Sequence, residues 1–370
     1  MTGATGFLGQ FVLRDLLLRG RRVVVLLRPP LHESRRRLAN LLRPLGAELD
    51  DHVQSGRLML REGALPEDLP DGEWGRTDDI LACAASLQLF SNGNGEPHRT
   101  NVEGTDMLLD WAARHNVNRL HAVSTAYVCG SHRGDIQEVF HPRPESFQTH
   151  YEESKWLAEQ RLADWSRTDG RVLSVLRPSF IIGESASGYT TQFGGFYQFG
   201  RMLSILKSEY GAGSNGSGTH IPVRIPGRSQ DPTQNFVPVD YAARIITEVV
   251  LNPDLQGRIY HVTDPLPLAC GEIKQVMEDY FHIHGGYFVD RDDLPDDKTR
   301  AESLLWDQYD LLMPRMRHPP RFDESNTREI RRRIGIEFPS LTRERMFTLL
   351  DYAVSQRWGQ RTSRRHARAD

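Results

Sequence analysis

A glycine-rich turn at residues 2–9 limits what this chain can fold into more than any other feature. It reads Thr-Gly-Ala-Thr-Gly-Phe-Leu-Gly, with glycines at positions 3, 6 and 9. Because glycine has no side chain and wide backbone freedom, such a loop can turn tightly and approach a phosphate closely. The helix predicted from Phe7 to about Arg19 then directs its unpaired N–H groups and positive dipole end at an anion. The turn therefore predicts a nucleotide-phosphate site.

A turn of this kind is expected to follow a buried β-strand. Here only Met1 precedes it. We therefore expect the first strand to be missing or truncated, with a start upstream of Met1. Loss of a central strand would expose the edges of its neighbours and remove buried area, which predicts poor stability or a compensating segment in its place.

The next segment favours NADP(H) over NAD(H). Residues 22–27 are mostly β-branched and aliphatic, as expected for a parallel strand buried on both faces. The strand ends at Arg28, about 20 residues after the last glycine, where a dinucleotide fold places the residue that selects the adenosine ribose. A guanidinium there suits a 2′-phosphate, whereas a carboxylate would suit a free 2′-hydroxyl. Arg35, Arg36 and Arg37 follow, and a solvated basic helix start is the better interpretation for two of these three.

Composition excludes several other classes of protein. A net charge of −3 despite 46 basic residues gives no electrostatic footprint for nucleic acid. Cys83, Cys129 and Cys270 have no metal-ligand spacing and cannot all pair, so we expect no metal and a reducing compartment. No apolar run approaches the roughly 20 residues that span a bilayer. The prediction is a cytoplasmic monomer or homodimer without a transmembrane segment.

Strand-like and helical segments alternate through the first half of the chain, which predicts an α/β fold with a doubly wound, Rossmann-type parallel sheet. The expected strands are 22–27, 58–60, 79–85, 119–124, 172–176, 236–239 and 259–262. The NADP-binding core is expected over 1–178 and 236–262. A smaller, mostly helical substrate lobe is expected over 179–235 and 263–358, followed by a disordered basic tail over 359–370.

The catalytic chemistry is predicted at Tyr151 and Lys155. Residues at i and i+4 of a helix share one face, so the phenol and the ammonium point the same way. The lysine cation stabilises a phenolate and lowers the tyrosine pKa toward the working range. Alone, such a pair is more often a coincidence on a surface helix. Thr125 strengthens the prediction, because it follows a predicted strand at the sheet edge where ligands bind.

Taken together, these motifs resemble the extended short-chain dehydrogenase/reductase superfamily. The motifs are residues 2–9, Cys-Ala-Ala at 83–85, Asn-Val-Glu-Gly-Thr at 101–105, Ser-Thr at 124–125, Tyr151 with Lys155, and Arg-Pro at 177–178. Within it, the chain is most similar to the fatty acyl-CoA reductase and thioester reductase branch. Residues 177–183, 188–189 and 235–241 carry that likeness, together with Phe-Asp at 322–323, Asn-Thr at 326–327 and Gly-Ile at 335–336.

The resemblance implies an NAD(P)H-dependent oxidoreductase and a role for each matching residue. Tyr151 would be the general acid, Lys155 would lower its pKa and bind the nicotinamide ribose, and Thr125 would orient the carbonyl. Asn101 would hold a proton-relay water, with a helix N-cap as the equal alternative. The implied NADP(H) contacts are Gly3, Thr5, Gly6, Phe7, Leu8, Gly9, Arg28, Arg37, Ala64, Leu65, Ala84, Ala85, Tyr151, Lys155, Pro178, Phe180 and Ile181.

One departure from the family lies at Ala64 and Leu65. The family commonly shows Gly-Asp-Leu where this chain has Gly-Ala-Leu at 63–65, so a carboxylate that usually bonds the adenine amine is missing. The expected reaction is NADPH-dependent reduction of a small or carrier-bound acyl thioester to an aldehyde or alcohol. Three alternatives remain open: a nucleotide-sugar epimerase or dehydratase, a hydroxysteroid-type ketone reductase, and a non-catalytic NADP(H)-binding regulator.

Overall fold

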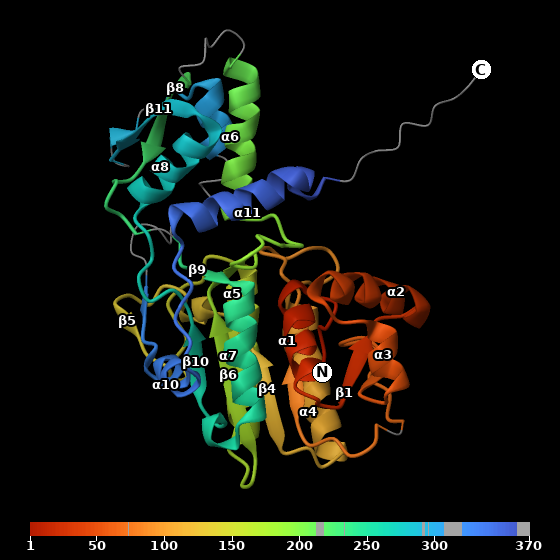
Figure 1. The fold of residues 1–370 in the computed structure, drawn as a ribbon. Coiled ribbons are helices and arrows are strands. Elements are labelled where there is room, and N and C mark those ends of the chain that lie inside the picture. The colour runs from red at the N-terminus through yellow and green to blue at the C-terminus, as the bar shows by residue number, and fades with distance from the viewer. Residues whose placement is uncertain are drawn as a thin grey trace, which may run out of the picture. The chain divides into compact units, whose positions relative to one another are not determined.

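The computed structural model describes residues 1–72, 74–211, 218–232, 234–290, 293–294, 296–306 and 320–360. The chain forms two compact units (Figure 1). The first unit comprises Met1–Ile181, Asn235–Leu266 and His318–Pro339, and the second comprises Ile182–Gln234, Pro267–Arg317 and Ser340–Asp370. Each unit is described separately below. Residues 361–370 of the predicted basic tail lie outside the described residues.

The first unit is built on parallel strands. One pair is β1 (Val23–Leu27) with β2 (Leu58–Glu62), and a second sheet has the order β10 (Ile259–Val262), β6 (Val172–Pro178), β4 (Arg119–Val123), β3 (Ile80–Ala82). Every one of these pairings is parallel. Because parallel strands need long crossovers, helices separate them in the chain. The predicted α/β class with a doubly wound parallel sheet is confirmed.

Met1 and Thr2 join the two sheets. The amine of Met1 donates to the Val24 carbonyl at 2.7 Å, and Leu26 N–H donates to the Met1 carbonyl at 3.0 Å. On the other side, Thr2 N–H donates to the Leu81 carbonyl at 3.0 Å, and Thr2 forms a parallel bridge with Ala82. These two residues therefore occupy the position between β1 and β3 where the first strand of the fold is expected.

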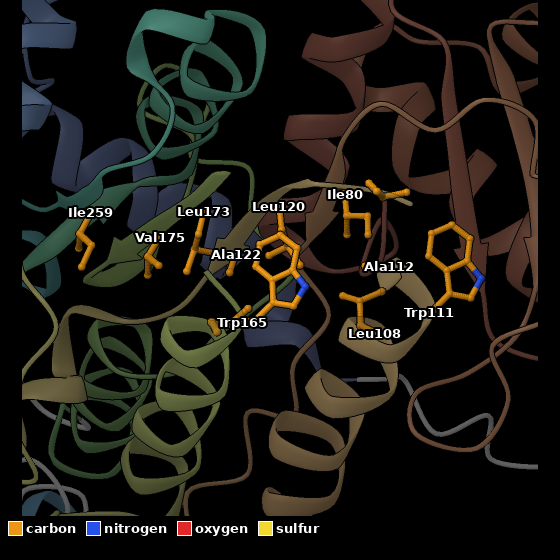
Figure 2. Packing of buried hydrophobic residues seen from close by; sticks show 12 residues of the cluster. Ile80, Leu108, Trp111, Ala112, Leu120, Ala122, Trp165, Leu173, Val175 and Ile259 are labelled. Carbon is orange, nitrogen blue, oxygen red and sulfur yellow. The ribbon is translucent and has the colours of Figure 1, made fainter. Parts of the chain in front are cut away.

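Helices cover both faces of the sheet. On one face, α4 (Gly104–Arg114) and α5 (His150–Ser166) bury their apolar sides against β3, β4, β6 and β10. Figure 2 shows this layer, with Trp111 and Leu108 of α4 beside Ile80. On the other face, α1 (Phe7–Leu18) packs against α7 (Val239–Leu251). Nearly all the large apolar side chains of these helices are buried, so helices cover both faces of the sheet.

The remaining elements complete the first unit. They are α2 (Leu31–Leu42), η1 (Arg43–Leu45), α3 (Leu49–Gln54), η2 (Arg99–Glu103), η3 (Ala126–Cys129), β5 (Asp135–Ile136), β7 (Phe180–Ile182), β9 (Phe236–Pro238), η4 (Pro253–Leu255), β12 (Arg321–Phe322) and α10 (Ser325–Ile334). Two of the short strand pairs, β12 with β5 and β7 with β9, stand apart from the central sheet. The last residue of β7 belongs to the second unit.

The second unit is mostly helical. It contains α6 (Phe196–Tyr210), α8 (Cys270–Phe281), α11 (Arg343–Ser355), η6 (Arg357–Gly359) and the parallel strand pair β8 (Thr219–Pro226) and β11 (Ile283–Val289). The hydroxyl of Tyr197 on α6 accepts a hydrogen bond from Gly183 N–H at 2.9 Å. In neither unit does a described helix have both the length and the apolar character needed to cross a bilayer.

Candidate nucleotide and catalytic site

The glycine loop is held against the segment that follows β3. Gly3 has φ of +73°, and a Cβ built on it would lie 2.5 Å from the Ala84 nitrogen. A Cβ on Gly9 would lie 2.1 Å from the Gly3 carbonyl oxygen, so α1 packs directly on the turn. Thr2 completes the contact, because its Oγ1 accepts from Cys83 N–H at 3.2 Å and from Ala84 N–H at 3.1 Å. The predicted loop residues thus form one close-packed cradle.

The start of α1 fits a dinucleotide pyrophosphate. The N-cap is Gly6, which has no side chain to bond the first-turn N–H groups, and the first turn holds no acidic residue. A helix start of this kind leaves its N–H groups for an anion. Gly6 is exposed and Thr5 is half-buried, whereas Phe7 and Leu8 are buried in the core. The cradle therefore presents backbone rather than side chains, as close approach of a phosphate requires.

The predicted arginines lie beyond this cradle. Arg28 follows the last residue of β1, and its carbonyl accepts a hydrogen bond from Ser34 Oγ on α2 at 2.7 Å. Arg37 is exposed on α2. Arg35, on the same helix, is paired with Asp50 at 2.6 Å. Among the described residues, neither Arg28 nor Arg37 has a carboxylate partner, so both guanidinium groups are available to an anion.

Asn101 clamps two segments together. It lies in η2, and its side chain accepts from Ser86 N–H at 2.8 Å, donates to the Ser86 carbonyl at 3.1 Å and donates to Ser154 Oγ at 2.9 Å. The alternative of a helix N-cap is wrong, because the N-caps of η2 and α4 are His98 and Glu103. Both amide donors are used inside the protein. Asn101 therefore fixes the loop after β3 to α5.

Helix α5 carries the predicted tyrosine and lysine. Its N-cap is Thr149, whose hydroxyl accepts from Glu152 N–H at 3.2 Å, so Tyr151 lies in the first turn. Lys155 lies one turn later and is buried, and its Nζ donates to the Val123 carbonyl at the end of β4 at 2.9 Å. Burial lowers the pKa of Lys155. One of the lysine's donors is thus bonded to the sheet edge, and burial disfavours the charged form of the group.

Thr125 follows β4 directly. Its backbone is extended and its buried hydroxyl accepts from Tyr127 N–H at 3.3 Å, which makes it the N-cap of η3. The preceding Ser124 donates its N–H to the Leu176 carbonyl at 2.7 Å. Thr125 and the Val123 carbonyl that holds Lys155 are therefore two residues apart at the carboxyl end of β4, the edge where open parallel sheets bind ligands.

A buried ion pair fixes α5 to the sheet. Glu159, one turn after Lys155, receives two hydrogen bonds from Arg177 of β6, at 3.0 and 2.6 Å, and the two side chains are 2% and 0% exposed. Arg177 also faces His261 Nε2 at 3.4 Å, while His261 Nδ1 meets the Asp323 carbonyl at 2.8 Å. Burial, and then the Arg177 charge, lower the pKa of His261 to about 3. The imidazole is therefore neutral.

The remaining predicted contacts frame this edge of the sheet. Ala64 exchanges backbone hydrogen bonds with Asp68, both at 2.7 Å, just after β2. Leu65 and the segment Ala84–Ala85 are half-buried. Pro178 ends β6, and half-buried Phe180 and Ile181 follow in β7. All of them lie at, or shortly after, the carboxyl ends of β2, β3 and β6.

An apolar surface beside Tyr151 has no counterpart among the predicted residues. Leu87, Leu89 and Phe90 are 54%, 39% and 52% exposed, although they are large and apolar. The Leu89 carbonyl accepts from Tyr151 N–H at 3.3 Å, and the Phe90 ring lies edge-on to His150 at 6.3 Å. The sequence could have pointed to these residues, because they follow the strand predicted over 79–85 and ligands bind at that end of a parallel strand.

Comparison with protein families gives one match over most of the chain. The NAD-binding family model described as "Male sterility protein" matches residues 1–246. Among curated proteins, the nonribosomal peptide synthetase asaC of Aspergillus flavus is 28% identical over 291 residues, covering 72% of this chain and 26% of that protein. The L-2-aminoadipate reductase of Schizosaccharomyces pombe is 24% identical over 370 residues, which cover 90% of this chain and 24% of that protein. The chain thus spans about a quarter of these relatives' length.

Solved structures share the fold. The terminal R domain from the myxalamid PKS-NRPS biosynthetic pathway superposes with a TM-score of 0.77 at 24% identity, covering 96% of this chain and 90% of that one. A thiolation-reductase di-domain from an archaeal non-ribosomal peptide synthetase gives a TM-score of 0.72 at 18% identity, and the match covers 97% of this chain and 90% of that one. At these identities the likeness shows the fold alone.

The crowding at Gly3 gives a stability test. We expect Gly3→Ala to lower the free energy of unfolding in urea by about 1–3 kcal/mol more than Gly20→Ala does. The control is matched, because Gly20 has φ of +71° with nothing within 4 Å of a built Cβ, whereas Gly3 at +73° abuts Cys83 and Ala84. Backbone strain is thus common to both variants. Equal losses would mean that the loop is not packed against the segment after β3.

The neutral state of His261 predicts a pH dependence. Between pH 6.5 and about 3 the unfolded chain binds a proton at His261 that the folded chain does not, so the free energy of unfolding falls as the pH falls through this range. Because His261→Gln removes that proton, we expect the stability difference between wild type and variant to shrink on acidification, by up to about 1.4 kcal/mol per pH unit.

Unfolding in urea at several pH values measures this difference. His32→Gln is the control, since His32 is exposed on α2. A difference between wild type and His261→Gln that stays constant from pH 7 to pH 4.5 would contradict a neutral imidazole facing Arg177.

Proposed function

Because the chain belongs to the NAD-binding family described as male sterility protein, we propose that it is an NAD(P)H-dependent oxidoreductase of the extended short-chain dehydrogenase/reductase type. Its proposed substrate is an acyl thioester held on a carrier protein or on coenzyme A. The observation that carries the proposal is the placement of Lys155, whose buried ammonium is bonded to the end of β4, two residues before Thr125 and one helical turn after Tyr151. That arrangement suits protonation of a carbonyl oxygen.

Each residue has a role in the proposed reaction. NADPH, when bound, supplies a hydride to the carbonyl carbon of the thioester. The Thr125 hydroxyl orients the carbonyl oxygen, and the Tyr151 phenol donates its proton to that oxygen as negative charge develops. The product of this step is a hemithioacetal. When its C–S bond breaks, the hydroxyl proton passes to the sulfur, so a thiol leaves and an aldehyde remains. Lys155 stabilises the phenolate left on Tyr151, and this effect is strong because its charge is poorly solvated.

Two further observations support an acyl thioester over other carbonyl compounds. The relatives include a protein named L-2-aminoadipate reductase and nonribosomal peptide synthetases, and one similar structure is a thiolation-reductase di-domain. The exposed Leu87, Leu89 and Phe90 beside Tyr151 offer a surface for an apolar acyl group, because burial of exposed apolar area is favourable on binding.

Incubation with NADPH and a panel of acyl thioesters tests the proposal. We expect loss of NADPH absorbance and formation of an aldehyde or alcohol with at least one thioester, presented on coenzyme A or on a phosphopantetheinylated carrier protein. In Tyr151→Phe the turnover falls by about 10²- to 10⁴-fold, the usual contribution of a general acid, while NADPH binding is retained. Tyr210→Phe serves as the control, since Tyr210 is exposed at the end of α6.

Two outcomes would overturn this function. One is turnover of a nucleotide sugar with no NADPH oxidation by any thioester, which would favour an epimerase or dehydratase. The other is binding of NADPH with no turnover of any carbonyl compound, which would favour a non-catalytic regulator. Full activity of Tyr151→Phe would remove only the role of the tyrosine.

Cofactor choice is proposed to rest on Arg28 and Arg37. In Arg28→Asp we expect NADPH affinity to fall about tenfold to a hundredfold, the value of a hydrogen bond to a charged group, with little change for NADH. Fluorescence titration with each dinucleotide gives the dissociation constants for NADPH and for NADH. Arg36→Asp carries the same charge change on exposed α2 and is the control. An equal loss for NADPH and NADH, or an equal loss in Arg36→Asp, would contradict selection by Arg28.

A further inference from the structure

The chain between β3 and η2 carries a short uncharged segment at residues 86–91, which reads Ser-Leu-Gln-Leu-Phe-Ser. Its three large apolar side chains, Leu87, Leu89 and Phe90, are all exposed. The segment follows the carboxyl end of β3, the edge at which an open parallel sheet binds its ligands. Exposed apolar side chains gathered at such an edge indicate a binding surface.

Asn101 fixes the first residue of segment 86–91. Its side chain accepts from Ser86 N–H at 2.8 Å and donates to the Ser86 carbonyl at 3.1 Å, so both backbone groups of Ser86 are held. The same amide donates to Ser154 Oγ at 2.9 Å, which connects this end of the segment to α5. The start of the segment is therefore anchored by a side chain that lies in η2.

The first turn of α5 fixes the other end. The Leu89 carbonyl accepts from Tyr151 N–H at 3.3 Å, and Ser91 N–H donates to His150 Nδ1 at 2.9 Å. In an extended chain the carbonyl of one residue and the N–H two residues later point the same way, so one edge of the segment bonds the helix. Phe90 lies between these two bonds, and its ring stands perpendicular to the His150 ring with the centroids 6.3 Å apart.

The bond from Ser91 requires an acceptor at one position of the His150 side chain. A backbone N–H can only donate, so Nδ1 is the acceptor and the ring hydrogen of the neutral imidazole lies on Nε2. The amide oxygen of asparagine stands the same number of bonds from the backbone as Nδ1, whereas that of glutamine stands one bond farther out. The two amides therefore distinguish the position of the acceptor from its mere presence.

Beyond Ser91 the loop is held by bonds of its own and by η2. Asn92 Oδ1 accepts from the N–H groups of Asn94 and Glu96, at 3.0 and 3.1 Å, and Glu96 accepts from the Thr100 hydroxyl at 2.6 Å. None of these bonds involves α5. The attachment of this end of segment 86–91 to α5 thus runs through the two bonds made by residues 89 and 91.

We propose that His150 is a positioning residue, which holds segment 86–91 against α5 so that its three exposed apolar side chains receive an alkyl chain of the acyl group. The inference rests on the proposed function and adds a preference for apolar acyl chains over short or polar ones. The surface is uncharged, so it gains free energy by burying an alkyl chain and offers no charged partner to a sugar or a phosphate. The bond from Tyr151 N–H to Leu89 keeps this surface beside the residue proposed to protonate the carbonyl.

Kinetics with acetyl and octanoyl thioesters on the same carrier, either coenzyme A or a carrier protein, test the inference. In His150→Ala we expect KM for the octanoyl thioester to rise about threefold to tenfold, the effect of one lost hydrogen bond between uncharged groups. The kcat stays unchanged, because the contact is made equally before and during the reaction. KM for the acetyl thioester also stays unchanged, because that group has no chain for the segment to bind.

His150→Asn and His150→Gln are a matched pair. We expect the asparagine to restore the wild-type KM for the octanoyl thioester and the glutamine to behave like the alanine. Hydrogen exchange of the peptide that contains Ser91, followed by mass spectrometry in the free protein, should quicken in the alanine and glutamine variants only. Leu87→Ser changes the surface and not its anchor, so it should raise KM for the octanoyl thioester while the exchange of Ser91 stays slow.

Several results would contradict the inference. If His150→Ala raises KM equally for both thioesters, or lowers kcat for both, the histidine supports the fold of α5 and not the binding of the chain. If the asparagine and glutamine variants behave alike, the bond to Ser91 is not what holds the segment. A wild type that reduces no thioester overturns the proposed function and this inference together, whereas an active wild type matched by His150→Ala overturns the inference alone.

Discussion

The phosphate cradle of the first unit depends on how Met1 and Thr2 pair between β1 and β3. Their backbone bonds join two sheets of parallel strands into one layer. Thr2 Oγ1 then holds the N–H groups of Cys83 and Ala84, and Gly3 packs against the same segment. The phosphate cradle is thus fixed by the sheet junction that precedes it.

A second constraint governs the proposed catalytic residues. Helix α5 is tied to the sheet at successive turns, by Lys155 to the Val123 carbonyl and by Glu159 to Arg177. Buried ion pairs add little net stability, but removing one partner is costly, so the pair holds the helix in one register. Asn101 adds a third tie through Ser154. Tyr151, in the first turn, is therefore positioned by contacts made deeper along the same helix.

Most strands of the first unit were predictable, because parallel strands buried on both faces leave runs of apolar residues. The strand predicted over 79–85 ends at Ala82 instead, since the N–H groups of Cys83 and Ala84 bond the side chain of Thr2 rather than a neighbouring strand. The clamp formed by Asn101 was also beyond prediction. Its partners Ser86 and Ser154 are 15 and 53 residues away.

The sequence by itself determined the class of fold, the glycine turn, and the spacing of Tyr151 and Lys155, because these depend on neighbours within a few residues. Only the tertiary structure decided which side chains meet. It placed Arg177 on Glu159 and turned the apolar Leu87, Leu89 and Phe90 to the surface beside Tyr151. Those outcomes depend on distant segments packing together, which no local pattern records.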